Sequence, residues 1–228
     1  QRLNAKATIV MHRTTPQIKV DAVRNRGAKV VLHGDSYDEA ASRATKLVEE
    51  KGMTHVHPFD DPDVIAGQGT IGMEIVRQHQ EPLDVLFVPV GGGGLLAGVA
   101  SYVKYVWPNT RIIGVEPEDA ACLKLALEKG RRASLSHVGL FADGCAVAQI
   151  GKETFRVIRK TVDEVITVST DEMCASIKDI FEDTRSIAEP AGALALAGLK
   201  KYTEREGVTG QSLLAIVSGA NTNFDRLR

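Results

Sequence analysis

The sequence is poor in the features that mark secreted and membrane-spanning proteins. Its 228 residues include only three cysteines, and none of them form a C-x-x-C pair. A small, odd number of thiols is typical of a reducing compartment rather than of a disulfide-stabilised domain. No apolar run approaches the roughly 18 residues that cross a membrane, and residues 1–11 lack the layout of a signal peptide. We therefore expect a cytoplasmic protein with no membrane partner, in which Cys122, Cys145 and Cys174 are buried thiols.

An excess of charge of one sign is also missing. The chain has 28 Lys and Arg against 29 Asp and Glu, which gives a formal net charge of −1. The two signs are interspersed, so no basic face for nucleic acid or anionic lipid is expected, and a small molecule is the expected partner. With 43% hydrophobic residues, the chain is long enough for one large α/β domain or a domain and a half.

Short runs rich in β-branched residues alternate with helix-length segments along the chain. The runs lie at 7–11, 29–34, 56–59, 85–90, 111–116, 162–169 and 213–219. This alternation predicts an α/β fold of open, mostly parallel sheets with helices on both faces. Proline and aspartate cluster in HPFDDPD at 57–63, where we place the boundary between a smaller lobe, residues 1–57, and a larger lobe, residues 58–228.

The expected helices carry start and stop signals. Ser36 with Glu39, and Ser169 with Glu172, have capping-box spacing. Prolines at first helical positions and glycines at C-terminal caps are expected at Pro62, Pro190, Gly27, Gly52, Gly130 and Gly207. A buried helix stripe is predicted for Met173, Ile177, Ile180 and Phe181.

The stretch VLFVPVGGGGLLAG at 85–98 is the strongest local signal for a ligand. A glycine turn between a strand and a helix presents free backbone N–H groups and the positive end of a helix dipole, which predicts a phosphate site at Gly91, Gly92, Gly93 and Gly94. We expect a side chain at Gly93 to occupy the space of the phosphate oxygens. Two alternatives remain: a ligand-free turn, and a dinucleotide site in which Glu116 binds the ribose of NAD.

Several longer motifs together resemble the catalytic domain of the threonine dehydratase family. They are HPFDDPDVIAGQGT (57–70), PVGGGGLLAG (89–98), GVEPEDA (114–120), FADGCAV (141–147), EPAGALALAG (189–198) and SGANTNF (218–224). The resemblance covers essentially the whole chain. It implies the tryptophan-synthase-β-like fold (fold type II), pyridoxal 5'-phosphate as cofactor, and a homo-oligomer. Serine racemases and serine dehydratases share several of these motifs.

The resemblance also implies roles for individual residues. Gly91, Gly92, Gly93, Gly94 and Leu95 would hold the cofactor phosphate, Gly144 and Glu189 would line the ring, and Ser218 would meet the pyridine nitrogen. A serine hydroxyl stabilises a pyridinium less than an aspartate would, which suits β-elimination. From the residues alone, Ser218 is equally well read as a turn cap, and Glu189 as an acid favoured at a helix N-terminus.

The implied reaction is the deamination of threonine or serine to 2-oxobutanoate or pyruvate and ammonia, in isoleucine biosynthesis. The family's Schiff-base lysine lies in a Ser-x-Phe-Lys motif, which this chain does not contain, so no catalytic residue is assigned. We expect the chain to be incomplete at its N-terminus, to lack the family's regulatory domain, and to be inactive alone. The alternatives are a serine racemase-like or serine dehydratase-like enzyme and a noncatalytic cofactor-binding module.

Possible metal ligands are sparse. His55 and His57 would share one face of a strand, without a third ligand nearby. In racemase relatives an acid, a carbonyl and a second carboxylate bind a divalent cation. Glu116 and Ala120 match the first two, but Cys122 stands in place of the hard oxygen ligand, so no metal is assigned.

Overall fold

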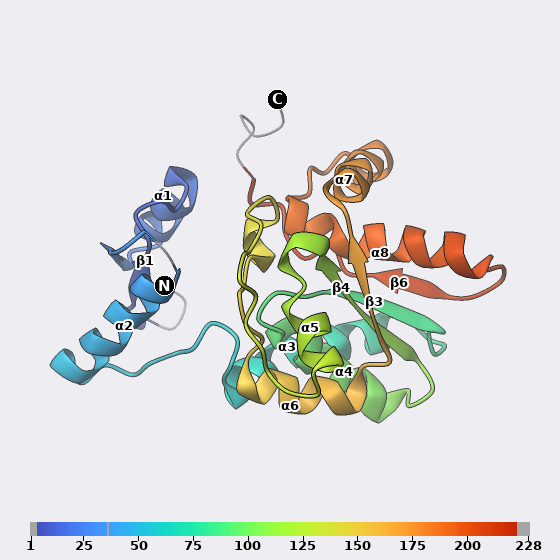
Figure 1. The fold of residues 1–228 in the computed structure, drawn as a ribbon, viewed down its shortest axis with the longest axis horizontal. Helices are drawn as coiled ribbons and strands as arrows, with labels where there is room; N and C mark the ends of the chain where they lie inside the picture. Colours follow the sequence, from blue (N-terminus) through green and yellow to red (C-terminus); the bar gives the residue numbers. More distant parts are fainter. Residues whose placement is uncertain (1–3, 36, 223–228) are drawn as a thin grey trace. The chain divides into compact units, whose positions relative to one another are not determined.

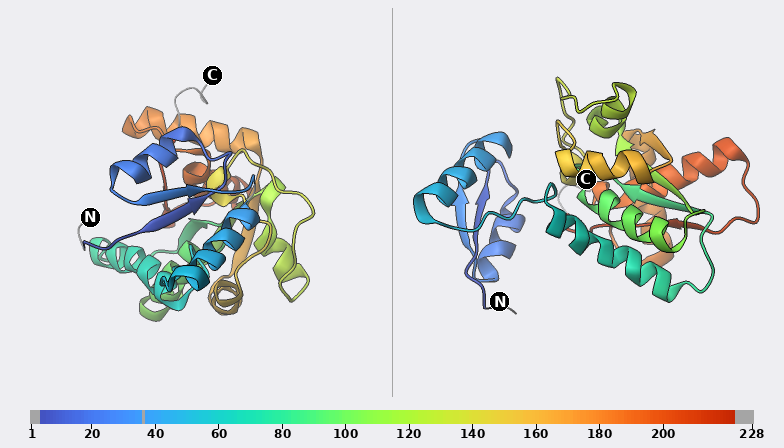
Figure 2. Two further views of the ribbon diagram at one scale, coloured as in Figure 1. Left: turned by 90° about the vertical axis from the view of Figure 1, so that its left-hand side faces the viewer. Right: turned by 90° about the horizontal axis from the view of Figure 1, so that it is seen from below.

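The computed structural model describes residues 4–35 and 37–222, which divide into two compact units. One unit ends at Val56, and the other is His57–Thr222. In the smaller unit, β1 (Thr8–Met11) and β2 (Lys29–Leu32) form a parallel pair, with Thr8 opposite Lys29. Figures 1 and 2 show α1 (Gln17–Asn25) and α2 (Tyr37–Lys51) beside this pair. Helix α1 lies between the two strands in the sequence and provides the crossover that a parallel pair requires.

The larger unit is a four-stranded parallel sheet with the strand order β5-β4-β3-β6. Its strands are β3 (Val85–Pro89), β4 (Arg111–Pro117), β5 (Glu164–Val168) and β6 (Leu213–Ala215). Its helices are α3 (Pro62–Gln78), α4 (Gly94–Val106), α5 (Cys122–Glu128), α6 (Lys152–Thr161), α7 (Thr170–Thr184) and α8 (Pro190–Glu206), with short 3-10 turns η1 (Glu118–Ala120) and η2 (Asp143–Cys145).

Both faces of this sheet are covered, because successive side chains of a strand point to opposite sides. Leu86 and Val88 of β3 face a core shared with α3, α4, α5 and α6. Val85 and Phe87 face a second core shared with α7 and α8. Figure 1 shows these two helix layers on either side of the sheet. The predicted fold class, a mostly parallel sheet with helices on both faces, is confirmed.

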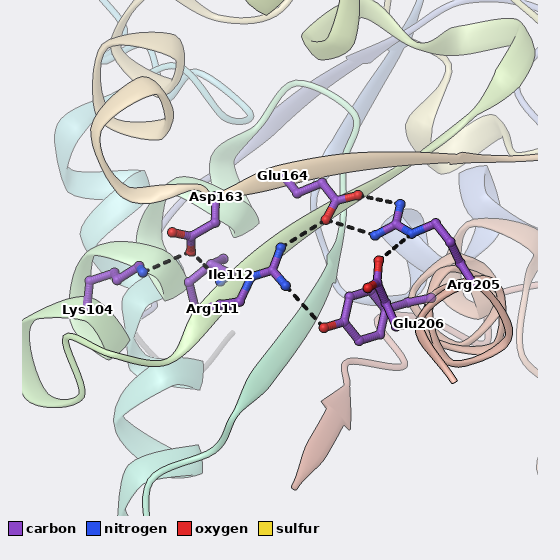
Figure 3. A network of polar contacts seen from close by, with 8 residues as sticks. Lys104, Arg111, Ile112, Asp163, Glu164, Arg205 and Glu206 are labelled. Carbon is purple, nitrogen blue, oxygen red and sulfur yellow. Dashed lines mark hydrogen bonds and ion pairs between the residues drawn. The ribbon is translucent and has the colours of Figure 1, made fainter. Parts of the chain in front are cut away.

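A polar network joins α8 to the amino ends of β4 and β5 (Figure 3). Glu164 accepts hydrogen bonds from Arg205 Nη1 at 2.6 Å and from Arg111 Nη2 at 3.1 Å. Both guanidinium groups also lie over the Tyr202 ring, at 5.5 Å from its centroid for Arg205 and 5.7 Å for Arg111. Beside them, Asp163 pairs with Lys104 at 2.8 Å. The contacts of Arg205 and Tyr202 fasten the C-terminal end of α8 to the sheet, and the Lys104–Asp163 pair joins α4 to the start of β5.

Most of the predicted helix signals are confirmed. Ser169 and Glu172 form a reciprocal capping box, and Pro62 and Pro190 are the first residues of α3 and α8. The glycines expected after helices all have positive φ: Gly27 (81°), Gly52 (60°), Gly130 (63°) and Gly207 (60°). Ser36 and residues 223–228 lie outside the described residues, and with them the Ser36 capping box and the end of the SGANTNF motif.

Three sequence predictions are wrong. Residues 56–59 form no strand, because His57 Nδ1 accepts the N–H groups of Phe59 (3.3 Å) and Asp60 (2.8 Å) and closes a turn instead. Phe181 is 44% exposed and lies under the Arg185 guanidinium rather than in the core. Cys174 is exposed, because it follows the buried Met173 on α7 and is rotated away from the core. Cys122 and Cys145 are buried as predicted.

Within the described residues, we find no helix that is both long and apolar enough to span a bilayer.

Candidate functional site

The glycine loop lies at the carboxyl end of β3 and leads directly into α4. Gly93 is the N-cap of α4 and has φ of 90°, a left-handed conformation that favours glycine. Ala97 N donates to the Gly93 carbonyl at 2.9 Å, which is the first bond of the helix. The N–H groups of residues 94–96 precede that bond and have no acceptor within the helix. Together with the helix dipole, this geometry suits a phosphate group.

Neighbouring segments approach the loop too closely for side chains. A Cβ atom added at Gly92 would lie 2.3 Å from Phe59 Cγ, and one at Gly91 would lie 3.0 Å from Cys145 Cα. These two positions therefore require glycine for close packing. At Gly93 an added Cβ would lie 2.8 Å from Ile150 Cδ1 and 3.1 Å from Thr154 Cβ. A side chain at Gly93 would therefore collide with the protein core, and our expectation that it would fill the phosphate space is wrong.

The other predicted ring contacts lie near this loop. A Cβ at Gly91 would be 3.3 Å from the Gly144 carbonyl, and a Cβ at Gly144 would be 3.6 Å from Glu189 Oε1. Glu189 N donates to the Gly219 carbonyl at 3.1 Å, and a Cβ at Gly219 would be 2.3 Å from Glu189 Oε1. The fold thus brings four distant segments together, from the glycine loop through Gly144 and Glu189 to Gly219.

Three residues with predicted cofactor contacts, Glu189, Ser218 and Leu95, are at least partly exposed. Glu189 is the N-cap residue of α8 and is half-buried, but its carboxylate makes no capping hydrogen bond to the helix within the described chain. Ser218 precedes Gly219, lies three residues beyond β6, and is exposed. Leu95, the second residue of α4, is half-buried. Glu189 and Ser218 therefore belong to the segments that meet the glycine loop at the carboxyl ends of β3 and β6.

Glu116 has a different role from a ribose ligand. Its side chain is fully buried at the end of β4, and its two oxygens accept the N–H groups of Leu123 (2.8 Å) and Lys124 (2.9 Å) at the start of α5. Burial raises the pKa of Glu116 to about 7, although the two N–H donors oppose the shift. Because both oxygens are used inside the protein, Glu116 is not available to a dinucleotide, and the NAD alternative loses its acid.

The structure also does not support the possible metal ligands considered from the sequence, the His55–His57 pair and the group of Glu116, Ala120 and Cys122. His57 Nδ1 accepts backbone N–H groups in the 57–60 turn, so His55 and His57 do not share a strand face. The fully buried Cys122 donates from Sγ to the Gly91 carbonyl at 3.5 Å. In the part of the chain that the structure describes, no three His, Cys, Asp or Glu side chains are grouped as a metal site.

Three residues around the loop were not singled out from the sequence. Phe59 covers Gly92, the Thr154 hydroxyl donates to the Gly92 carbonyl at 2.8 Å, and Asp60 accepts the first N–H groups of α6. Phe59 and Asp60 belong to the HPFDDPD stretch, which we interpreted as a domain boundary and as part of a family motif, without assigning a role to either side chain. The hydrogen bond of Thr154 spans 62 residues of sequence, and no local pattern signals such a contact.

Comparisons with known proteins agree on one family. The family model described as "Pyridoxal-phosphate dependent enzyme" matches residues 1–219. The biosynthetic L-threonine dehydratase IlvA of Burkholderia multivorans is 57% identical over 230 residues, which cover 100% of this chain and 45% of that protein. The solved structure of the processed form of threonine deaminase isoform 2 from Solanum lycopersicum superposes with a TM-score of 0.96 at 50% identity, over 100% of this chain and 66% of that one.

Serine racemase is similar at a greater distance. The maize serine racemase structure has a TM-score of 0.92 at 30% identity, over 99% of this chain and 69% of that chain. The chain spans about half or less of the length of the curated relatives it matches, with 45% for the Burkholderia protein and 38% for a chloroplastic threonine dehydratase of Arabidopsis thaliana.

Proposed function

This chain belongs to the family of pyridoxal-phosphate-dependent enzymes, and from that premise we propose that it is a portion of the catalytic domain of a biosynthetic L-threonine dehydratase. The observation that carries the proposal is the convergence of the glycine loop, Gly144, Glu189 and Gly219 at the carboxyl edge of one parallel sheet. In open parallel sheets, ligands bind at this edge.

The residues present fit the cofactor. The backbone N–H groups of Gly91–Gly94 and Leu95 would hold the phosphate at the N-terminus of α4, where Gly93 adopts the left-handed conformation and the helix dipole is positive. Gly144 and Glu189 would line the ring. The Ser218 hydroxyl would meet the pyridine nitrogen as a neutral hydrogen-bond partner. Pyridoxal phosphate, when bound, supplies an electron sink for the charge that develops at the substrate Cα.

The proposed reaction converts threonine to 2-oxobutanoate and ammonia, and serine to pyruvate and ammonia. The substrate loses its Cα proton and its β-hydroxyl group, and water later replaces nitrogen. A hydroxyl at the pyridine nitrogen, rather than a carboxylate, favours this elimination over reactions that need greater charge delocalisation. No Ser-x-Phe-Lys sequence occurs among the 228 residues, so we assign neither the nucleophile nor the base of the reaction to this chain.

The test is an assay of the protein in its natural full-length form, saturated with pyridoxal phosphate. We expect keto acid and ammonia to be released in equal amounts from L-threonine, and from L-serine with a lower kcat/KM. Formation of D-serine without keto acid would favour the racemase-like alternative. If the protein binds the cofactor but forms neither product, the noncatalytic module is the better description.

We also propose a homo-oligomer in a reducing, cytoplasmic compartment. The three free cysteines and the absence of any disulfide among the described residues support the compartment. Exposed apolar side chains on the larger unit, such as Tyr105 (87% exposed) and Leu140 (71%), would be available to an interface between subunits. Sedimentation equilibrium of the full-length protein measures the assembly, and a monomer at micromolar concentration would contradict it.

A further inference from the structure

Three carbonyl groups of the glycine loop, those of Gly91, Gly92 and Gly93, accept hydrogen bonds from the protein. Cys122 Sγ donates to the Gly91 carbonyl at 3.5 Å, and Ala97 N donates to the Gly93 carbonyl at 2.9 Å. The Gly92 carbonyl accepts two bonds, from Thr154 Oγ1 at 2.8 Å and from Gly151 N at 3.3 Å. The loop therefore has three consecutive anchored carbonyls, and the middle one is held by α6.

These anchors fix the directions of the N–H groups that follow. No cis peptide bond occurs among the described residues, and in a trans peptide the N–H of one residue points opposite to the carbonyl of the residue before it. A donor that fixes the Gly92 carbonyl thus fixes the Gly93 N–H on the far side of the same plane. Because glycine has few steric restrictions, the peptide planes of this loop would be less well oriented without these hydrogen bonds.

Thr154 is well placed for this task. Its side chain is fully buried, and its hydroxyl bond to Gly92 is the shortest of the bonds to the loop carbonyls. Its backbone is held in turn by Asp60, whose carboxylate accepts the N–H groups of Lys152 (2.8 Å), Glu153 (2.8 Å) and Thr154 (3.2 Å). The Thr154 hydroxyl lies on the carbonyl side of the Gly92–Gly93 peptide, opposite the Gly93 N–H, so we assign it no contact with the phosphate.

We infer that Thr154 is a positioning residue, whose hydroxyl turns the Gly92–Gly93 peptide so that the Gly93 N–H donates to the cofactor phosphate. The inference rests on the proposed function, because it takes the glycine loop as the phosphate site. It assigns Thr154 an effect on the phosphate alone, and none on the ring.

The experiment compares pyridoxal phosphate with pyridoxal, which lacks the phosphate, by titration of the full-length protein. The dissociation constant of pyridoxal divided by that of pyridoxal phosphate isolates the contribution of the phosphate. A general loss of folded protein weakens the binding of both ligands equally and leaves this ratio unchanged. We expect Thr154→Val to reduce this ratio by about three- to tenfold, the value of one hydrogen bond, and Thr154→Ser to retain it. Thr161→Val is the matched control, because Thr161 lies on the same helix and its hydroxyl bonds only Val157 O (3.1 Å) among the described residues.

The outcomes separate the two levels of the argument. If the wild-type protein prefers pyridoxal phosphate and Thr154→Val keeps the full preference, the positioning role is wrong while the phosphate site stands. If the wild type shows no preference, the phosphate site itself is wrong, and the inference is overturned with it. If Thr154→Val does not fold, Thr154→Ala against Thr154→Ser gives the same comparison, and an equal ratio in these two variants overturns the inference.

Discussion

Replacing Asp60 with alanine should weaken the larger unit and the cofactor site together. The Asp60 carboxylate accepts three backbone N–H groups at the start of α6, two of them at 2.8 Å. Loss of a side-chain cap costs about 1 kcal/mol, and loss of a negative charge at a helix N-terminus costs a further 0.3 to 1 kcal/mol, roughly. We therefore expect Asp60→Ala to lower the free energy of unfolding by about 1.3 to 2 kcal/mol.

The cofactor effect follows from what the first turn of α6 carries. Gly151 N and Thr154 Oγ1 both bond the Gly92 carbonyl, so disorder in this turn releases the loop. Asp60→Ala should therefore also reduce the preference for pyridoxal phosphate over pyridoxal. Asp61→Ala is the control next to it: Asp61 caps α3 by accepting Asp63 N (2.8 Å) and Val64 N (3.2 Å), so its loss should cost about 1 kcal/mol and leave the preference unchanged.

Urea denaturation followed by tryptophan fluorescence measures the stability. Trp107 is the only tryptophan of the chain and is buried at the end of α4, so its signal reports the larger unit. The pH dependence gives a second check. Burial alone would raise the pKa of Asp60, but the backbone N–H donors outweigh it and lower the pKa below the ordinary value. The advantage of wild type over Asp60→Ala is thus present above about pH 4 and is lost as the pH falls through the folded-state pKa.

The reasoning would be refuted by an Asp60→Ala protein whose unfolding free energy changes by less than about 0.5 kcal/mol and whose ligand preference equals that of wild type. An equal loss of preference in Asp61→Ala would also contradict it, because the effect would then reflect general destabilisation.

Three further predictions concern the ring site, the buried acid and the catalytic lysine. Ser218→Ala should leave the urea midpoint unchanged, because Ser218 is exposed, and should lower kcat by raising the activation barrier by the value of one hydrogen bond, about 0.5 to 1.5 kcal/mol. Ser212→Ala, at the residue just before β6, is the control, and unchanged kinetics in Ser218→Ala would contradict the assigned role. Since burial raises the folded-state pKa of Glu116 from 4.5 to about 7, the folded state binds an extra proton between these values, and stability should fall by about 3 kcal/mol as the pH rises through that window. Glu116→Gln should flatten that part of the urea-midpoint profile against pH, and parallel profiles for the two proteins would show that another group titrates. A polypeptide of these 228 residues alone should release keto acid from threonine at near-background rates, because proton transfer by a positioned side chain contributes about 10²- to 10⁴-fold and the Ser-x-Phe-Lys motif is absent; borohydride trapping of a lysine adduct, or robust turnover, would show that one of its own lysines serves.

The parts of the fold that the sequence predicts well depend on local chemistry. The strand, glycine turn and helix at 85–98 are each specified by neighbouring residues in the sequence. The same holds for the Ser169 capping box and for the glycine after α8. The run at 56–59 misleads because its β-branched and aromatic residues suggest a strand, while the imidazole of His57 captures the N–H groups that a ladder would need. The pattern of apolar and polar residues does not show that a side chain will accept these N–H groups.

The candidate site shows the same limit at longer range. Its glycines are recognisable because they are consecutive, and its ring residues were reached only through resemblance to a family. The contact between Thr154 and Gly92, and the use of Glu116 by the start of α5, depend on packing between elements. Spacing along a chain does not encode such contacts, since the partner is decided by which helix covers which face of the sheet.

All four strands of the larger unit run parallel, so one edge of the sheet carries all the amino ends of the strands and the opposite edge carries all the carboxyl ends. The network of Glu164, Arg111 and Arg205 lies at the amino ends, opposite the edge where the glycine loop sits. Surface ion pairs of this sort each change stability by about 0 to 1 kcal/mol, and networks matter more as temperature rises. Evolution can therefore adapt the protein to a new growth temperature by rebuilding this end, one charge at a time, while the chemistry at the opposite end of the same strands is left as it was.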